Sequence, residues 1–250
     1  MNKLPEIESK IVCRPGYLTG RTQHFIINPA SQIFWEDFCF KFHSLFKLTD
    51  PIDSFAGKIN PYFGYFGYRW HPVTFQPRYY HIGIDISEQT GYPIKAVYDG
   101  LLAYSGFADI NGNYIVIRHP DIGTEDGFVF QTLYMHCKDI NVRFNLAQKI
   151  WREYVSETLP LANKTIPAGQ DIATLGCTGN NLGVVPHLHL QFEFVKGNKH
   201  IAINPLNLFN KNSFQNLTAS FVSDTEFKSF YQQHTKELLP WKKFFRQSFL

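Results

Sequence analysis

The sequence predicts a mainly β protein built on antiparallel strands, with a helical insertion and helical termini. From Ile59 to Leu208, short apolar alternations are broken repeatedly by glycine, which is typical of antiparallel strands joined by turns. Two runs in this region, residues 81–86 and 187–192, alternate strictly between apolar and other residues. The chain is also rich in aromatic residues, with 24 Phe and 13 Tyr, and aromatic side chains favour strands.

Composition indicates a globular protein and narrows the range of functions that the protein could have. Of the 250 residues, 44% are hydrophobic and 18% are charged, so the chain can bury a sizeable core. The net charge is +3, from 24 basic and 21 acidic residues, which is too small and too dispersed to indicate nucleic-acid binding. No apolar run approaches the roughly 20 residues of a membrane-spanning helix. Residues 1–23 show no apolar segment of the kind found in a secretory signal.

The four cysteines do not indicate a metal cluster. Cys13, Cys39, Cys137 and Cys177 have no CxxC spacing. Their pairing and the redox compartment stay open at this point.

The chain divides into three parts. Residues 1–54 form an N-terminal segment, with near-helical apolar spacing from Phe34 to Leu48, and this segment is a candidate groove cover or regulatory element. Residues 55–210 form the β domain. Residues 211–250 form a C-terminal helical extension, in which a helix is predicted from Asp224 to Leu239.

Within the β domain, three inner strands and one helix stand out. The clearest strands are Ile94–Tyr104, Tyr114–His119 and Phe128–His136. A helical insertion is predicted over residues 141–161, because apolar residues recur there every fourth position with charges between them, namely Val142, Leu146, Ile150 and Tyr154.

Histidine and aspartate residues gather on the polar faces of the two alternating runs. Successive side chains of a strand point to opposite faces. In residues 187–192 all apolar side chains therefore share one face, and His187 and His189 share the other. In residues 81–86 the isoleucines share a face, which leaves His81 and Asp85 together with only Gly83 between them. We expect Gly83 to keep this polar face unobstructed.

We interpret His81, Asp85 and His189 as ligands of a catalytic zinc ion. Two imidazoles and a carboxylate leave a fourth tetrahedral position open for water or substrate. A single histidine on a strand is usually an ordinary polar residue, so the interpretation depends on several of them occurring together. His136 ends a third strand, and His187 lies about 6.5–7 Å from His189 by strand geometry. We expect His136 and His187 to orient or deprotonate the attacking water, since the ordinary pKa of histidine is near neutrality.

Short motifs follow one another in a fixed order from about Asn60 to Leu208. They are Gly67-x-Arg69-x-His71-Pro72, His81-x-Gly83-x-Asp85, Tyr134-x-His136, Gly169-Gln170, Leu175-Gly176-x-Thr178-Gly179, His187-Leu188-His189 and Asn204-Pro205. Each motif alone is weak. As an ordered set they are specific, and the set resembles the lysostaphin-like (LytM) zinc metallopeptidases of family M23.

The resemblance implies a fold, a site and an activity. The implied fold is an antiparallel sheet sandwich or half-barrel with an open active-site groove over one sheet. The implied site has zinc on His81, Asp85 and His189, and catalytic roles for His136 and His187. The implied activity is that of a zinc-dependent endopeptidase that hydrolyses peptide bonds in peptidoglycan crosslinks or stem peptides.

Two other functions stay open. Some domains of this fold have lost their metal ligands and act by binding and activating other cell-wall hydrolases, and the complete ligand set of this chain favours an enzyme over such a module. A zinc carboxypeptidase of the D-Ala-D-Ala type uses a similar ligand set but adds a Glu-x-x-His motif, which the sequence lacks. Peptidoglycan as the substrate places the expected action in the periplasm, in the cell envelope or outside the cell. The extra segments also leave room for a regulatory protein partner.

Three features depart from the family pattern. The loop from Gly179 to His187 is about two residues longer than expected. Gln191 stands where a glutamate commonly follows the second histidine. The insertion at 141–161 precedes the Gly169-Gln170 turn and is placed to cover or extend the groove. None of the three removes a proposed ligand.

Overall fold

The computed structural model describes ten stretches of the chain and the elements within them. The described residues are 3–8, 11–12, 18–19, 22–27, 32–59, 64–69, 79–142, 165–179, 185–197 and 199–209. The strands are β1 (Ile11–Val12), β2 (Leu18–Thr19), β3 (Thr22–Ile27), β4 (Gly67–Arg69), β5 (Tyr79–His81), β6 (Ile84–Ser87), β7 (Pro93–Lys95), β8 (Gly100–Ala108), β9 (Gly112–Gly123), β10 (Val129–Cys137), β11 (Thr165–Ile166), β12 (Asp171–Thr174), β13 (His187–Lys196) and β14 (Lys199–Ile203). The helices are α1 (Gln32–Leu45), the 3-10 helix η3 (Phe55–Lys58) and α2 (Pro205–Leu208).

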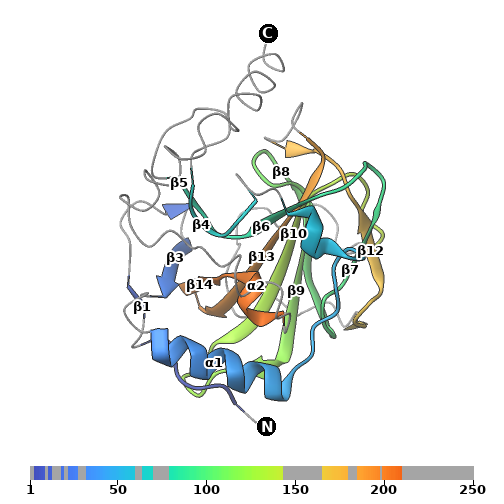
Figure 1. Ribbon diagram of the computed structural model, residues 1–250. Coiled ribbons are helices and arrows are strands. Elements are labelled where there is room, and N and C mark those ends of the chain that lie inside the picture. The colour runs from blue at the N-terminus through green and yellow to red at the C-terminus, as the bar shows by residue number, and fades with distance from the viewer. Residues whose placement is uncertain are drawn as a thin grey trace.

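One large sheet forms the centre of the described structure (Figure 1). Its ten strands follow the order β1-β3-β14-β13-β10-β9-β8-β11, with β2 beside β3 and β6 beside β13. The pair β14 and β3 is parallel, and the other pairs of described strands in this sheet are antiparallel. Two small sheets, β12-β7 and β4-β5, complete the described strands. The predicted mainly β, antiparallel architecture is confirmed.

Strand β13 has neighbours along both of its edges. On one edge β10 pairs with it from Val195 to His189. On the other edge β14 pairs with it from Phe192 to Lys196, and β6 pairs with it from His187 to Leu190. Strand β13 therefore carries its histidines within a backbone that is held by neighbouring strands.

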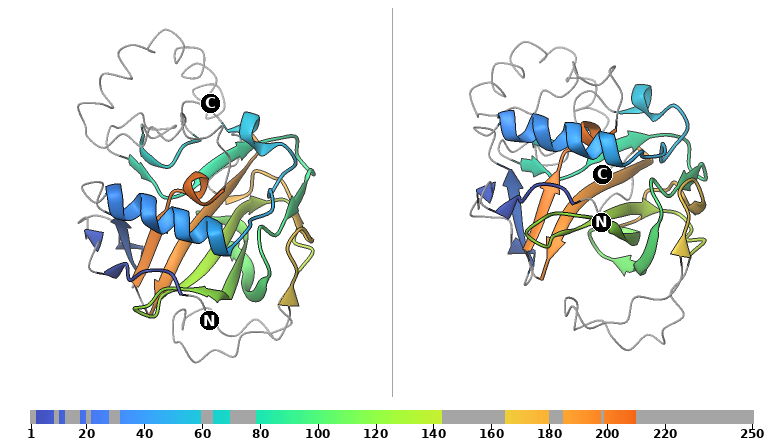
Figure 2. Two further views of the ribbon diagram at one scale, coloured as in Figure 1. Left: turned by 60° about the horizontal axis from the view of Figure 1, so that its bottom comes forward. Right: turned by 90° about the horizontal axis from the view of Figure 1, so that it is seen from below.

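Helix α1 covers the apolar face of this sheet, and the predicted helix near residues 34–48 is confirmed. Phe38 and Phe42 are fully buried, with the ring of Phe38 at 5.5 Å from Phe194 and the ring of Phe42 at 5.9 Å from Phe130. Figure 2 shows the helix lying across the strands. Since Phe194 and His189 lie on opposite faces of β13, α1 packs on the face away from the histidines. Within the described residues no helix, including the 14-residue α1, has the length and apolar character needed to cross a membrane.

The described parts of residues 1–54 join the same structure at several places. Strand β3 extends the main sheet beside β14. Leu4 donates its backbone N–H to the carbonyl of Gly123 at the end of β9, and Asp126, between β9 and β10, accepts from the backbone N–H groups of Ile7 and Glu8. The boundaries of the three predicted parts, and a role of residues 1–54 as a groove cover or regulator, stay predictions.

The run 81–86 is not one strand, so that prediction is wrong. Strand β5 ends at His81 and β6 begins at Ile84. The cause is a change of partner, because β5 pairs with β4 whereas β6 pairs with β13. His81 and Asp85 consequently come from two different sheets.

The predicted strand Ile94–Tyr104 is also divided, into β7 and β8. Between the two strands the backbone bonds to other parts of the chain. The N–H of Ala96 donates to the carbonyl of Gln170, and the N–H of Val97 donates to the hydroxyl of Tyr134. The predicted strands Tyr114–His119 and Phe128–His136 correspond to β9 and β10 and are confirmed.

Several predictions concern residues outside the described part of the chain. The helical insertion falls largely on residues 143–164, and the helix Asp224–Leu239 lies beyond residue 209. These stay predictions. In the described part, Cys39, Cys137 and Cys177 are free thiols, and Cys137 is buried.

Candidate metal centre and catalytic site

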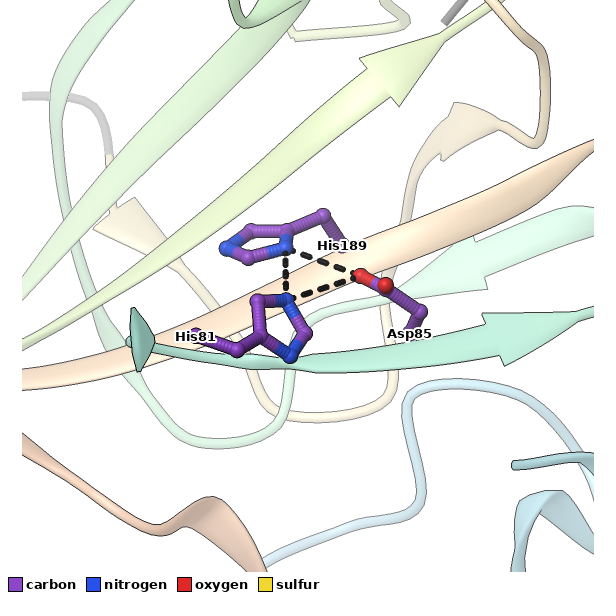
Figure 3. A group of neighbouring side chains, drawn as sticks. All are labelled: His81, Asp85 and His189. Atoms are coloured by element: carbon purple, nitrogen blue, oxygen red, sulfur yellow. Dashed lines mark hydrogen bonds and ion pairs between the residues drawn. The ribbon is translucent and has the colours of Figure 1, made fainter. Parts of the chain in front are cut away.

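Three side chains converge on one point between β5, β6 and β13 (Figure 3). The Nε2 atom of His81 lies 2.9 Å from the Nδ1 atom of His189 and 3.2 Å from Oδ1 of Asp85. The distance between Nδ1 of His189 and Oδ1 of Asp85 is 2.9 Å. All three residues are buried. The structure thus brings together the three residues that the sequence suggested as ligands.

The outer nitrogen of each imidazole faces an oxygen acceptor. Nδ1 of His81 is 2.9 Å from the backbone carbonyl of Tyr65, and Nε2 of His189 is 3.4 Å from Oε1 of Gln191. A carbonyl oxygen only accepts, so each outer nitrogen carries the proton and each inner nitrogen presents a lone pair. Two lone pairs and a carboxylate oxygen therefore face one another within 2.9–3.2 Å.

This donor set fits a metal cation. The three electron-rich atoms repel one another unless a positive charge lies between them. In a tetrahedral site with bonds of 2.0–2.1 Å, neighbouring donors lie about 3.3 Å apart. The separations of 2.9–3.2 Å are close to that spacing. The arrangement is therefore compatible with metal binding and needs little rearrangement to achieve it.

Gly83 gives His189 the room to take this position. A Cβ atom on Gly83 would lie 2.6 Å from Nε2 of His189 and 2.6 Å from the carbonyl oxygen of Leu190. Real Cβ contacts essentially never come so close, and the Leu190 carbonyl belongs to a paired strand that cannot yield easily. The expectation that Gly83 keeps the polar face unobstructed agrees with this packing.

A Gly83→Ala variant should bind metal more weakly than the parent, because the added methyl group displaces the His189 ring. We expect a loss of roughly 10- to 100-fold in zinc affinity, the range seen when ligand orientation is disturbed. Competition with a chelating dye measures it. Gly57→Ala is the matched control, since nothing lies within 4 Å of a Cβ at that exposed position. Equal zinc affinities for the two variants would contradict the packing argument.

His136 and His187 lie beside the converging donors. Their ring centroids are 5.2 Å apart, and the His136 ring is 6.1 Å from the His189 ring. Nδ1 of His136 donates to the carbonyl of Thr178, and Nδ1 of His187 donates to the carbonyl of Val185, both at 2.9 Å. In both rings it is Nδ1, and not Nε2, that makes the hydrogen bond to the backbone. Nε2 of His187 lies 3.7 Å from Oδ1 of Asp85.

The backbone of His136 is held in an unusual conformation. Its φ angle is +64°, in the left-handed region that costs a non-glycine residue about 1–3 kcal/mol. The His136 N–H donates to the carbonyl of Asn111, which helps to hold this irregular part of β10, between Tyr134 and Cys137, in place. Burial, reinforced by the neighbouring His187 and His189, lowers the pKa of His136 to about 3. The ring is therefore neutral at pH 7.

Thr178 positions His136, a role that the sequence alone does not reveal. Its carbonyl accepts from His136, its hydroxyl donates to the carbonyl of Cys137, and the same hydroxyl oxygen accepts from the N–H of Asn113. The Leu175-Gly176-x-Thr178-Gly179 motif marks this segment of the sequence. What the motif could not show is that the threonine bonds both to His136 and to the residue after it.

Comparison with known proteins places the site within a family. The model of peptidase family M23 matches residues 79–205, which are 127 of the 250 residues. The matched range contains His81, Asp85, His136, His187 and His189.

Individual proteins similar to this chain include two that are named as peptidases. The peptidoglycan DD-endopeptidase ShyC of Vibrio cholerae is 33% identical over 147 residues, covering 58% of this chain and 26% of that protein. The DD-carboxypeptidase/endopeptidase Mpg of Neisseria meningitidis is 32% identical over 126 residues, covering 50% of this chain and 23% of that protein. The chain thus spans about a quarter of the length of these relatives.

Solved structures match this chain with lower sequence identity than these two relatives. A zinc-containing peptidase from Vibrio cholerae matches with a TM-score of 0.43 and 25% identity, over 64% of this chain and 39% of that one. Lysostaphin from Staphylococcus simulans matches with a TM-score of 0.40 and 23% identity, over 60% of this chain and 51% of that one. Because the family model covers more than half of the chain, and does so over the region that carries the converging histidines and aspartate, this protein belongs to peptidase family M23.

Proposed function

We propose that this protein is a zinc-dependent endopeptidase that hydrolyses peptide bonds in peptidoglycan. The observation that carries the proposal is the convergence of Nε2 of His81, Oδ1 of Asp85 and Nδ1 of His189, with two further histidines beside them. Two imidazoles and one carboxylate make up a set of three protein ligands that leaves one coordination position open, as catalytic zinc sites do.

His81, Asp85 and His189 would hold the ion. When bound, zinc supplies Lewis acidity, which polarises the scissile carbonyl and makes water a stronger nucleophile at neutral pH. Tyr65 and Gln191 keep the two histidine ligands in the required tautomers through their oxygen atoms.

His136 and His187 would carry the proton transfers. The backbone carbonyls of Thr178 and Val185 accept from their Nδ1 atoms, so each ring in its neutral form offers a lone pair at Nε2. One ring accepts the proton of the attacking water at Nε2. Once protonated, it donates to the leaving amine. The second ring stabilises the oxyanion of the tetrahedral intermediate in its imidazolium form, in which Nε2 carries a proton and can donate. No residue of the described site supplies a glutamate base, so imidazole has this task.

The names of the relatives support peptidoglycan as the substrate class. One is named a peptidoglycan DD-endopeptidase and another a DD-carboxypeptidase/endopeptidase. Crosslinks and stem peptides are therefore the bonds to test. An enzyme with this substrate acts in the cell envelope or outside the cell, and this is part of the proposal.

Digestion of purified sacculi tests the proposal directly. The 250-residue chain is incubated with sacculi after chelation, and again after zinc is restored, and the released muropeptides are identified by mass spectrometry. We expect crosslinked dimers to become monomers only in the presence of zinc. Loss of a terminal D-alanine without loss of crosslinks would instead indicate carboxypeptidase activity.

The alternative function is a non-catalytic module that binds and activates other cell-wall hydrolases. Zinc-loaded protein that leaves every muropeptide intact, yet raises the activity of an added hydrolase, would contradict the endopeptidase and support this alternative.

A further inference from the structure

We propose that Gln191 and Glu193 act together as positioning residues that fix which nitrogen of His189 faces the metal. The inference rests on the proposed metal site and adds residues to it. Both lie on β13, two and four residues after His189, so all three side chains are on the same face of the strand. Gln191 is 2% exposed and Glu193 is fully buried.

The three side chains are linked in a row. Oε1 of Gln191 lies 3.4 Å from Nε2 of His189, and the Gln191 amide nitrogen donates to Oε1 of Glu193. The amide therefore connects the imidazole with a buried carboxylate.

Glu193 is anchored by neighbouring strands. Its Oε2 atom accepts from Nε2 of Gln131 on β10 at 2.9 Å and from Nδ1 of His200 on β14 at 2.8 Å. With Gln191 included, at least three donors surround this carboxylate. A buried carboxylate with this many donors is held in one orientation, because breaking any bond leaves a buried polar atom without its partner.

The direction of each hydrogen bond follows from the carboxylate. An ionised carboxylate only accepts, so Gln191 must turn its NH₂ group toward Glu193. Its carbonyl oxygen then faces His189 and can only accept, so Nε2 of His189 must carry the proton. Nδ1 is left with its lone pair pointing toward His81 and Asp85, as a metal ligand requires.

The direction of these hydrogen bonds explains why the side chain at position 191 is an amide in this chain. A glutamate at 191 could still accept from His189, but its second oxygen would face the carboxylate of Glu193 in a buried site. Two carboxylates in contact there would repel each other and lose a hydrogen bond. Positions 191 and 193 are therefore coupled: one side chain must be an amide and the other a carboxylate.

Exchanging the two residues tests the coupling. The variants are Gln191→Glu, Glu193→Gln and the double variant that carries both. In the double variant, the amide placed at position 193 can donate to the carboxylate placed at position 191 and accept from Gln131 and His200, so every hydrogen bond is restored.

Zinc affinity, measured by competition with a chelating dye, is the first readout. It should fall about 10- to 100-fold in Gln191→Glu and return to within about threefold of the parent in the double variant. The exposed Gln89→Glu variant is the matched control and should bind zinc like the parent.

A second readout follows the tautomer itself. The ¹⁵N chemical shifts of the His189 ring in the zinc-free protein should report a proton on Nε2 in the parent and in the double variant, and mixed tautomers in Gln191→Glu. If Gln191→Glu does not fold, Gln191→Met removes the same hydrogen bonds without adding charge, and it should show the same mixed tautomers.

Distinct outcomes separate the inference from the proposed function. A double variant that binds zinc as weakly as Gln191→Glu, or a single variant with parental affinity and tautomer, would overturn the coupling and leave the metal site standing. A parent protein that binds no zinc in the same assay would overturn the metal site itself.

Discussion

An Asp85→Ala variant is expected to fold normally and to lose both zinc binding and hydrolysis. Oδ1 of Asp85 lies 2.9 Å from His189, 3.2 Å from His81 and 3.7 Å from His187, so one oxygen faces three imidazoles. Without this carboxylate, only the imidazoles of His81 and His189 would remain as metal ligands. A tightly held zinc ion is bound with roughly 10–16 kcal/mol over four ligands, so removing one should weaken binding by about 3–4 kcal/mol, or about 10²- to 10³-fold.

The fold should survive this substitution because the structural bonds of Asp85 are made by its backbone. Its N–H donates to the carbonyl of Gly64, and it pairs with His189 across the β6–β13 ladder. Zinc titration, muropeptide release and thermal unfolding of the zinc-free protein measure the three properties. Asp121→Ala, at an exposed position on β9, is the matched control. Parental zinc affinity in Asp85→Ala would rule this residue out as a ligand.

His136→Ala and His187→Ala are expected to separate catalysis from metal binding. Each variant should keep one zinc ion per chain and lose about 10²- to 10⁴-fold in kcat, the usual contribution of a positioned acid or base. The double variant should lose much less than the product of the two single effects, because groups that act in one proton transfer are not independent.

Zinc content, kcat and KM are measured on the same preparations. His43→Ala is the control, because His43 lies on α1 and α1 packs on the opposite face of the sheet. If His187→Ala, with zinc bound, hydrolysed muropeptides at the parental rate, its assigned role would be wrong. If one of these variants instead lost its zinc, the substituted histidine would have to be counted among the metal ligands.

The parts of the site that follow from strand alternation could be predicted from the sequence. The HLHLQF run had to place His187 and His189 on one face and the apolar side chains on the other, and the structure has that arrangement. His81 and Asp85 were expected to lie together on one strand. They do lie together, but on β5 and β6, because a change of pairing partner cannot be seen in the alternation of a six-residue run.

The parts that depend on long-range register could not be predicted. His136 reaches the site because Met135 pairs with His189 across β10 and β13, which lie 54 positions apart in sequence at this pair. The acceptors that fix the imidazoles of His81, His136 and His187 are backbone carbonyls, and a carbonyl has no residue type that a sequence motif could reveal. Strand alternation alone places Glu193 on the same face as His189, since the two are four residues apart. Its role in positioning His189, however, depends on Gln131 and His200 from two other strands.

The two histidine ligands differ in how firmly the backbone beneath them is held. Strand β13 is paired on both edges, whereas β5 is a three-residue strand paired with β4 alone among the described strands. Backbone segments open locally more often when fewer hydrogen bonds hold them. The segment that carries His81 should therefore open locally while the main sheet stays intact. His189 then stays in place, with Gln191 and Glu193 behind it. The rate at which a metal ion enters and leaves would then be set by the brief departures of His81, with the remaining donors already in position for its return.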